Sequence, residues 1–126
     1  MEYCLKPKPE KSAKALGVNL RISTKNSVIV CKAIRGKTLE KGKKLLEDLI
    51  DKKRSLNGKY YTNACKEILE VLKSAEANAE FKGLDLEKLI IHASAHKGFS
   101  FWTPRRFKLR RRRKKTTNIQ IILIQR

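Results

Sequence analysis

The chain has 126 residues, 34% of them charged, and a formal net charge of +19. This length fits one domain, and its three scattered cysteines lack metal-ligand spacing, which indicates a reducing compartment. No apolar run reaches the length of about 18 residues that a membrane span needs, and the first residues do not resemble a signal peptide. A soluble, cytoplasmic protein is expected.

The positive charge is concentrated near the C-terminus. Residues 88–126 hold 12 basic side chains and no acidic one. Because such a balance adds self-repulsion and no stability, it predicts a polyanionic partner such as nucleic acid. A membrane surface is the weaker alternative, since this charge lies in a β-type region and not on one face of an amphipathic helix.

In chain order, the sequence first predicts a tail and a strand. Residues 1–12 contain two prolines among polar residues and are expected to form an extended tail, with a single domain over residues 13–126. Ala13–Ile22 alternates at period two, which predicts a strand with Lys14 and Arg21 on or near its solvent side. Four apolar residues share one face of this strand: Leu16, Val18, Leu20 and Ile22.

Three amphipathic helices are expected next. The first covers Thr24–Arg35, the second runs from Thr38 to about Lys53, and the third covers about Tyr61–Lys82. Gly36 and Gly83 are the expected helix stops. The third helix has the most regular apolar stripe, formed by Ala64, Ile68, Val71, Leu72, Ala75 and Ala79.

A long β-hairpin is predicted between two apolar runs near the C-terminus, with strands near Leu89–Trp102 and Lys114–Gln125 and a tip near Phe107. We call residues 97–115 the arm; its outer part, 105–115, carries nine basic residues in eleven positions. Successive strand side chains point to opposite faces, so four consecutive arginines make both faces cationic. Such a strand has no apolar side to pack on protein, and it projects by about 30 Å.

Other interpretations of the arm are a disordered basic tail or a nuclear-localisation run, and an arginine-rich helix beginning at Pro104. The residues after the arm favour the hairpin. Ile119, Ile121 and Leu123 alternate as a strand does. A disordered tail would not need an apolar strand after the basic residues.

Aromatic residues are interleaved with charge at the start of the arm. Their rings can stack on unpaired bases, as in many RNA-binding proteins, or pack across the hairpin. Packing is favoured for Phe99 and Phe101, and both roles stay open for Trp102 and Phe107.

The two histidines, His92 and His96, invite a metal or general-base interpretation. On a strand they lie about 13 Å apart, too far to share one zinc ion. No Gly-rich phosphate loop, catalytic triad or carboxylate pair is present. We therefore expect no cofactor, no metal and no enzyme activity, with a nuclease as the remotest alternative.

Five short motifs occur in an order that resembles a known family. They are Asn19-Leu-Arg-Ile-Ser23, Ala33-Ile-Arg-Gly-Lys37, Ala75-Glu-Ala-Asn-Ala-Glu80 with Gly83-Leu-Asp85, Trp102-Thr-Pro-Arg105 and Thr116-Thr-Asn-Ile-Gln-Ile121. Together they resemble the universal large-subunit ribosomal protein twenty-two in its archaeal and eukaryotic form, called seventeen in eukaryotes. Relatives usually carry glycine and alanine at the tip and a longer connection at 54–59.

This resemblance implies an α+β fold, with three helices packed on a three-stranded antiparallel sheet and a long protruding basic hairpin. It implies a structural constituent of the large ribosomal subunit, whose hairpin runs through ribosomal RNA toward the peptide exit tunnel wall and supports assembly. The implied partners are large-subunit ribosomal RNA, neighbouring large-subunit proteins and the nascent peptide near the tip. A free-standing nucleic-acid-binding or regulatory protein is the alternative.

Basic and aromatic residues of the hairpin and of two secondary regions are the expected RNA contacts. They are Lys14, Arg21, Lys25, Arg35, Lys37, Lys97, Trp102, Arg105, Arg106, Phe107, Lys108, Arg110, Arg111, Arg112, Arg113, Lys114 and Lys115.

Overall fold

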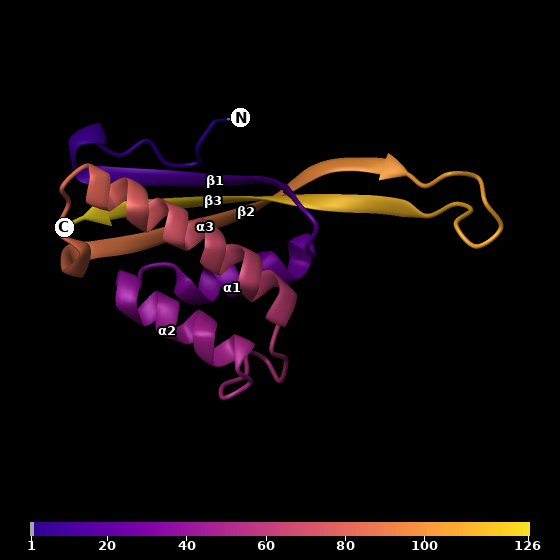
Figure 1. The fold of residues 1–126 in the computed structure, drawn as a ribbon, viewed down its shortest axis with the longest axis horizontal. Coiled ribbons are helices and arrows are strands. Elements are labelled where there is room, and N and C mark those ends of the chain that lie inside the picture. Colours follow the sequence, from indigo (N-terminus) through magenta and orange to yellow (C-terminus); the bar gives the residue numbers. More distant parts are fainter. Residues whose placement is uncertain (1) are drawn as a thin grey trace.

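The computed structural model describes residues 2–126 and confirms the α+β fold class. Three helices cover one face of a three-stranded antiparallel sheet of order β1-β3-β2 (Figure 1). The elements are β1 Ser12–Leu20, α1 Thr24–Ile34, α2 Leu39–Ile50, α3 Thr62–Phe81, β2 Leu89–Trp102 and β3 Arg113–Gln125, with 3-10 turns at Pro9–Lys11 and Leu86–Lys88.

All three predicted helices are present, and their ends depend on local backbone geometry. Ser23 Oγ accepts the Asn26 amide at the start of α1. Gly36 and Gly83 follow α1 and α3 with φ of 79° and 69°, a region that glycine enters without steric cost. The second helix ends at Ile50, earlier than the predicted Lys53, and Lys52 lies in the left-handed region with φ of 58°.

The core lies between the helices and the inner face of the sheet. All six predicted stripe residues of α3 are buried. The inner face of β1, however, is formed by the small residues Ala13, Ala15 and Gly17, not by the larger apolar residues that alternate with them. Val18 is 53% exposed, so the expected apolar face was wrong for Leu16 and Val18, whereas beyond the register shift between Gly17 and Leu20 the expected Ile22 is buried in the core and Leu20 packs against it. Small side chains are needed because α3 crosses β1 closely: a Cβ on Gly17 would lie 2.8 Å from the Val71 side chain.

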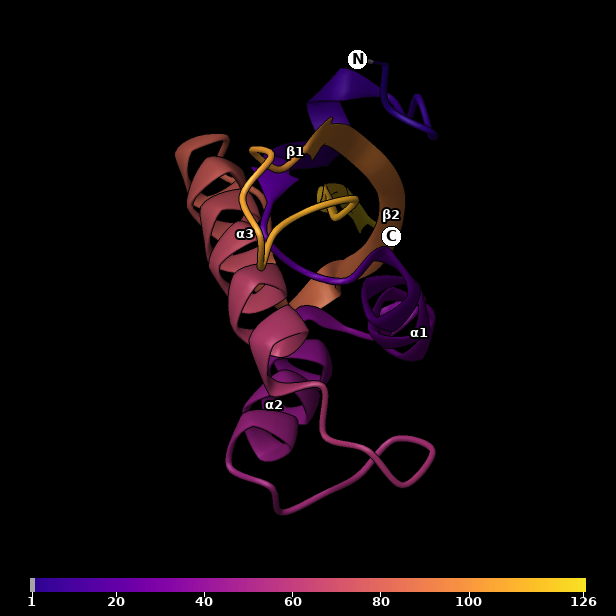
Figure 2. The same cartoon turned by 90° about the vertical axis from the view of Figure 1, so that its right-hand side faces the viewer.

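Residues 2–8 cover the outer face of the sheet, opposite the helices (Figure 2). Gln120 of β3 is only 2% exposed, and its side chain bonds the backbone of this segment. Oε1 accepts the Cys4 amide at 3.0 Å, and Nε2 donates to the Glu2 carbonyl at 2.9 Å. These residues belong to the segment expected to be an extended tail; Met1 lies outside the described residues.

Strands β2 and β3 pair from Leu89↔Gln125 out to Trp102↔Arg113. These bounds differ from the predicted strands by one residue at most. Their paired ends extend past the helices, and the connecting loop, 103–112, closes them at the far end (Figure 1). Phe107 lies in the middle of that loop.

Candidate nucleic-acid interface

A network of short polar side chains joins β1 to the base of the arm. The Asn19 amide donates to Asn118 Oδ1 at 2.8 Å, and Asn19 Oδ1 accepts from the Phe99 amide and from Thr116 Oγ1, both at 3.2 Å. Asn19 has φ of 53°, a conformation that asparagine tolerates better than most residues. Thr116 Oγ1 also lies 2.5 Å from the Phe99 carbonyl, so its one hydroxyl proton is shared between this carbonyl and Asn19 Oδ1. The last residues of β1 therefore fix the position where the arm leaves the body.

The same junction contains a close approach that requires glycine. The β2–β3 register shifts between Lys97 and Ser100, which marks a bulge. A Cβ on Gly98 would lie 2.6 Å from Thr116 Oγ1 and 3.1 Å from the Thr116 backbone carbon. Thr117 adds a further hydrogen bond between β3 and the residues after β1, because its Oγ1 donates to the Ile22 carbonyl at 2.8 Å. The junction is thus tightly constrained on both strands.

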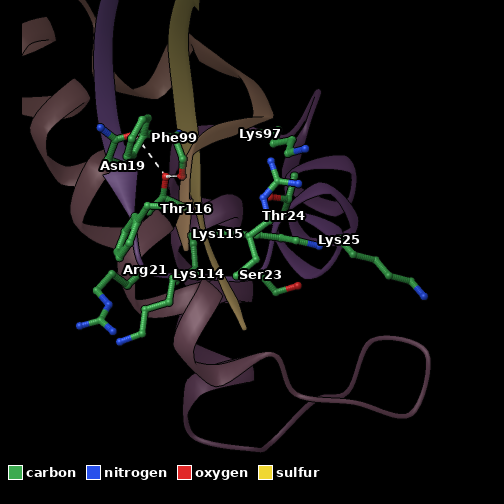
Figure 3. Close-up of a pocket in the computed structure, with 13 residues that line it drawn as sticks. Asn19, Arg21, Ser23, Thr24, Lys25, Lys97, Phe99, Lys114, Lys115 and Thr116 are labelled. Atoms are coloured by element: carbon green, nitrogen blue, oxygen red, sulfur yellow. Dashed lines mark hydrogen bonds between the residues drawn. The ribbon is translucent and has the colours of Figure 1, made fainter. Parts of the chain in front are cut away.

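An open hollow lies beside this junction, and we call it the groove. It lies between the end of β1, the start of α1 and the base of the arm (Figure 3). Lys25 and Lys97 lie on one side of it, and Arg21 and Lys114 on the other. Six basic residues line the groove, and all are exposed: Arg21, Lys25, Lys97, Arg113, Lys114 and Lys115.

Two aromatic side chains also line the groove. Phe99 and Phe101 stack on each other with ring centroids 6.1 Å apart and planes inclined by 23°. The sequence favoured packing across the hairpin for these rings, but the ring contact joins two residues of the same strand, and the side chains remain 65% and 45% exposed. The strand partner of Phe101 is Lys114, so no second aromatic or branched apolar side chain lies directly opposite it.

The tip of the arm holds the other predicted arm contacts. The Thr103 amide donates to the Arg112 carbonyl at 3.0 Å, and regular pairing stops there, one residue before Pro104. This agrees with the loss of a donor at proline. Trp102 is 69% and Phe107 88% exposed. The basic residues around them are also exposed: Arg105, Arg106, Lys108, Arg110, Arg111 and Arg112.

No carboxylate neutralises the arm within residues 2–126. The ion pairs of this part of the chain join Lys6, Lys43, Lys53 and Lys88 to acids of the tail, the helices and the turns. Arg113 is held instead by Ser100, whose Oγ accepts from Nε at 3.0 Å and from Nη2 at 2.6 Å. The arm cations are consequently available to an external anion.

Three predicted contact residues lie apart from the arm and the groove. Arg35 lies on the edge of β2, where Nε and Nη2 donate to the Ala93 carbonyl at 3.1 and 2.8 Å. The nearby Lys37 carbonyl accepts the Ile91 amide, and its side chain is exposed. Lys14 lies on the outer sheet face with Nζ 5.1 Å from the centre of the Tyr3 ring. Arg35 thus has a structural partner that its sequence position did not reveal.

The histidines and cysteines do not form a metal centre within the described residues, where no three His, Cys, Asp or Glu side chains gather. His96 Nε2 lies 3.0 Å from Cys4 Sγ, whereas Nδ1 of His92 is buried without a hydrogen-bond partner. Burial raises the pKa of the Cys31 thiol to about 12 and that of Cys65 to about 11, so both remain protonated at neutral pH.

In residues 2–126 no helix is both long and apolar enough to cross a membrane.

An α+β body with a cationic two-stranded extension is typical of a nucleic-acid-binding protein. The chain belongs to the family described as "Ribosomal protein L22p/L17e", whose sequence profile matches residues 15–124. It is therefore a ribosomal protein, as the five motifs predicted.

The similarity to archaeal members extends over most of the chain. The protein called "Large ribosomal subunit protein uL22" in Archaeoglobus fulgidus is 43% identical, over 78% of this chain and 77% of the relative. The proteins of the same name in Methanocaldococcus jannaschii and Methanosphaera stadtmanae are 36% and 40% identical, over 98% and 96% of this chain and 94% of each relative. The first of these two alignments is 146 positions long, so that relative contains segments that this chain of 126 residues lacks.

Proposed function

We propose that the protein is a structural constituent of the large ribosomal subunit in the cytoplasm, where it binds large-subunit ribosomal RNA. The arm runs through the RNA toward the wall of the peptide exit tunnel, with its tip near the nascent peptide. The body contacts neighbouring large-subunit proteins, and binding of the whole chain supports subunit assembly. It performs this role without catalysis.

The observation that carries the proposal is the arm's uncompensated charge. Arg110, Arg111 and Arg112, expected in a strand, lie in the connecting loop 103–112, where the basic side chains are exposed, and no carboxylate of residues 2–126 pairs with the arm. Phosphates surrounding this exposed basic loop and the paired strand ends beneath it are the counter-ions that such an arm fits. The names of the archaeal relatives place them in the large ribosomal subunit. This supports ribosomal RNA as the source of these phosphates.

Binding by this arm is mainly electrostatic, and the shape of the protein determines where the arm lies along the RNA. Each cation that neutralises a phosphate releases a counter-ion, so affinity falls as salt rises. The polar network at Asn19 and Thr116 sets the direction in which the arm leaves the body, so the cations reach RNA along a defined path. Phosphate contacts of this kind position a protein without reading sequence.

Sedimentation of cell lysate through a sucrose gradient, after a high-salt wash, tests the proposal. We expect the chain to remain with the large subunit at about one copy each, because contacts buried in RNA resist the wash. Appearance of the chain in light fractions would instead support a free-standing nucleic-acid-binding protein.

A charge variant makes the test specific to the arm. Replacing Arg110, Arg111 and Arg112 by glutamine removes three exposed cations from the tip. Binding to large-subunit RNA should lose roughly 0.7 to 0.9 units of log–log salt dependence per phosphate contact removed. The matched control replaces three exposed helix lysines, Lys44, Lys66 and Lys73, and should leave the salt dependence nearly unchanged. Equal slopes for the two variants would contradict the proposed role of the arm.

A further inference from the structure

The stacked rings of Phe99 and Phe101 are the feature of the groove that charge alone does not explain. Phe99 is 65% exposed and Phe101 45%, although burying a phenylalanine side chain is strongly favourable. They contact each other along one strand, and the residue opposite Phe101 is Lys114. The pair therefore presents apolar aromatic surface at the groove.

The position of this ring pair is fixed by the backbone beneath it. The Phe99 amide donates to Asn19 Oδ1 at 3.2 Å, and the Phe99 carbonyl accepts from Thr116 Oγ1 at 2.5 Å. Gly98 allows this close approach, because any Cβ there would meet Thr116. A backbone held in this way places both rings together on the same strand before a ligand binds, and preorganisation of this kind increases affinity.

The surroundings of the rings define the chemistry of a ligand. Six exposed cations line the groove, and no acidic side chain does. An apolar protein surface would cover these cations without pairing them, which is costly. A ligand with flat aromatic groups between negative charges satisfies both the rings and the cations. Nucleic acid has this composition.

We infer that the groove binds an unpaired nucleotide of RNA, with its base stacked on the Phe99–Phe101 ring pair and its flanking phosphates on the groove cations. The base must be unpaired because the faces of a base inside a duplex are covered by its neighbours. The outer arm, by contrast, contacts phosphates whatever their pairing. This inference rests on the proposed RNA-binding function and assigns a distinct ligand to the base of the arm.

Two RNA hairpins that differ by one nucleotide test this assignment with the full-length protein. One has a fully paired stem and the other carries a single bulged 2-aminopurine, whose fluorescence falls when it stacks; a flexible non-nucleotide linker closes each stem, so that the bulge is the only unpaired base. The test variant replaces Phe99 and Phe101 by leucine, and its partner replaces both by tyrosine, which keeps the rings. Phe81→Leu is the control for loss of an exposed aromatic, since Phe81 is 94% exposed at the end of α3. Circular dichroism melting confirms that each variant is folded.

The wild-type protein should bind the bulged hairpin at least about fivefold more tightly than the paired one and quench its fluorescence. The leucine variant should lose the preference and the quenching, whereas the tyrosine and Phe81→Leu variants should keep both. Equal wild-type binding of the two hairpins, or a preference that survives in the leucine variant, would overturn the base site and leave RNA binding by the arm standing. Failure of the wild-type protein to bind either hairpin would overturn the proposed function as well.

Discussion

The amide of Asn19 donates to Oδ1 of Asn118 at 2.8 Å, which ties the end of β1 to the central strand where the arm begins. This contact is one of three that Asn19 makes with β2 and β3, and the other two use its side-chain oxygen. The direction of the arm therefore depends on a residue of the body that carries no charge.

Replacing Asn19 by alanine should destabilise the protein. The substitution removes the acceptor for the Phe99 amide and one of the two acceptors of Thr116 Oγ1, and it places alanine at φ of 53°, where asparagine is better tolerated. We expect a loss of about 2–3 kcal/mol in the free energy of unfolding, measured with urea. Asn57→Ala is the matched control, because Asn57 has φ of 50° in an exposed turn. It should show only the smaller loss that the backbone conformation causes, and equal losses would mean that the Asn19 hydrogen bonds add no stability.

Replacing Gln120 by alanine should release the N-terminal segment from the sheet. The side chain of Gln120 satisfies the Cys4 amide and the Glu2 carbonyl, and it is itself buried. Loss of the Gln120 side chain should lower the free energy of unfolding by about 1–2 kcal/mol. It should also speed hydrogen exchange of the amides in residues 2–8. Gln125→Ala, at the half-buried end of β3, is the matched control. Unchanged exchange in residues 2–8 would show that Gln120 does not hold this segment.

Periodicity and helix signals predicted most of the fold. The α3 stripe and the strands of the hairpin have strong patterns, because a 3.6-residue or two-residue repeat is continuous there. The inner face of β1 was missed because a closely packed helix requires the small residues Ala13 and Ala15 there, and larger apolar residues alternate with them on the outer face. The cover that residues 2–8 provide for that face was not anticipated either.

The candidate site could be predicted only in part. Runs of basic residues locate the arm, because unneutralised charge is visible in sequence. The groove was not predicted, since it forms where Lys25 of α1 meets Lys97 and Lys114 of the arm. The roles of Gly98 and Thr116 depend on a bulge and a close approach, which no local pattern encodes.

Arg35 should contribute more to stability than to RNA binding. Its guanidinium donates two hydrogen bonds to the Ala93 carbonyl at the edge of β2, a geometry that lysine cannot reproduce. Arg35→Lys should therefore lower the free energy of unfolding by about 1–2 kcal/mol while leaving the charge and the salt dependence of RNA binding nearly unchanged. Lys37→Gln, two residues away and exposed, should show little change in stability. A stable Arg35→Lys variant with weakened RNA binding would contradict this assignment.

His92 should make stability depend on pH in the weakly acidic range. Burial, and then the nearby charge of Arg35, lower the pKa of its imidazole in the folded state below the ordinary value of 6.5. The folded state therefore binds fewer protons than the unfolded state, and stability is lost as pH falls through the unfolded pKa near 6.5. Above about pH 7.5 the imidazole is neutral in both states, and its contribution to the free energy of unfolding is fully present.

The substitution His92→Gln isolates this effect, because the carboxylates that also titrate are common to both proteins. The free energy of unfolding of wild type and variant should be measured with urea at about pH 7.5 and about pH 5, on either side of the ordinary imidazole pKa. The wild-type protein should lose more stability than the variant between these two conditions, since at position 92 its unfolded state gains more of a proton than its folded state does. Parallel losses would mean that the imidazole is as easily protonated in the fold as in the unfolded chain, and that the unpartnered Nδ1 of His92 carries no penalty for charge.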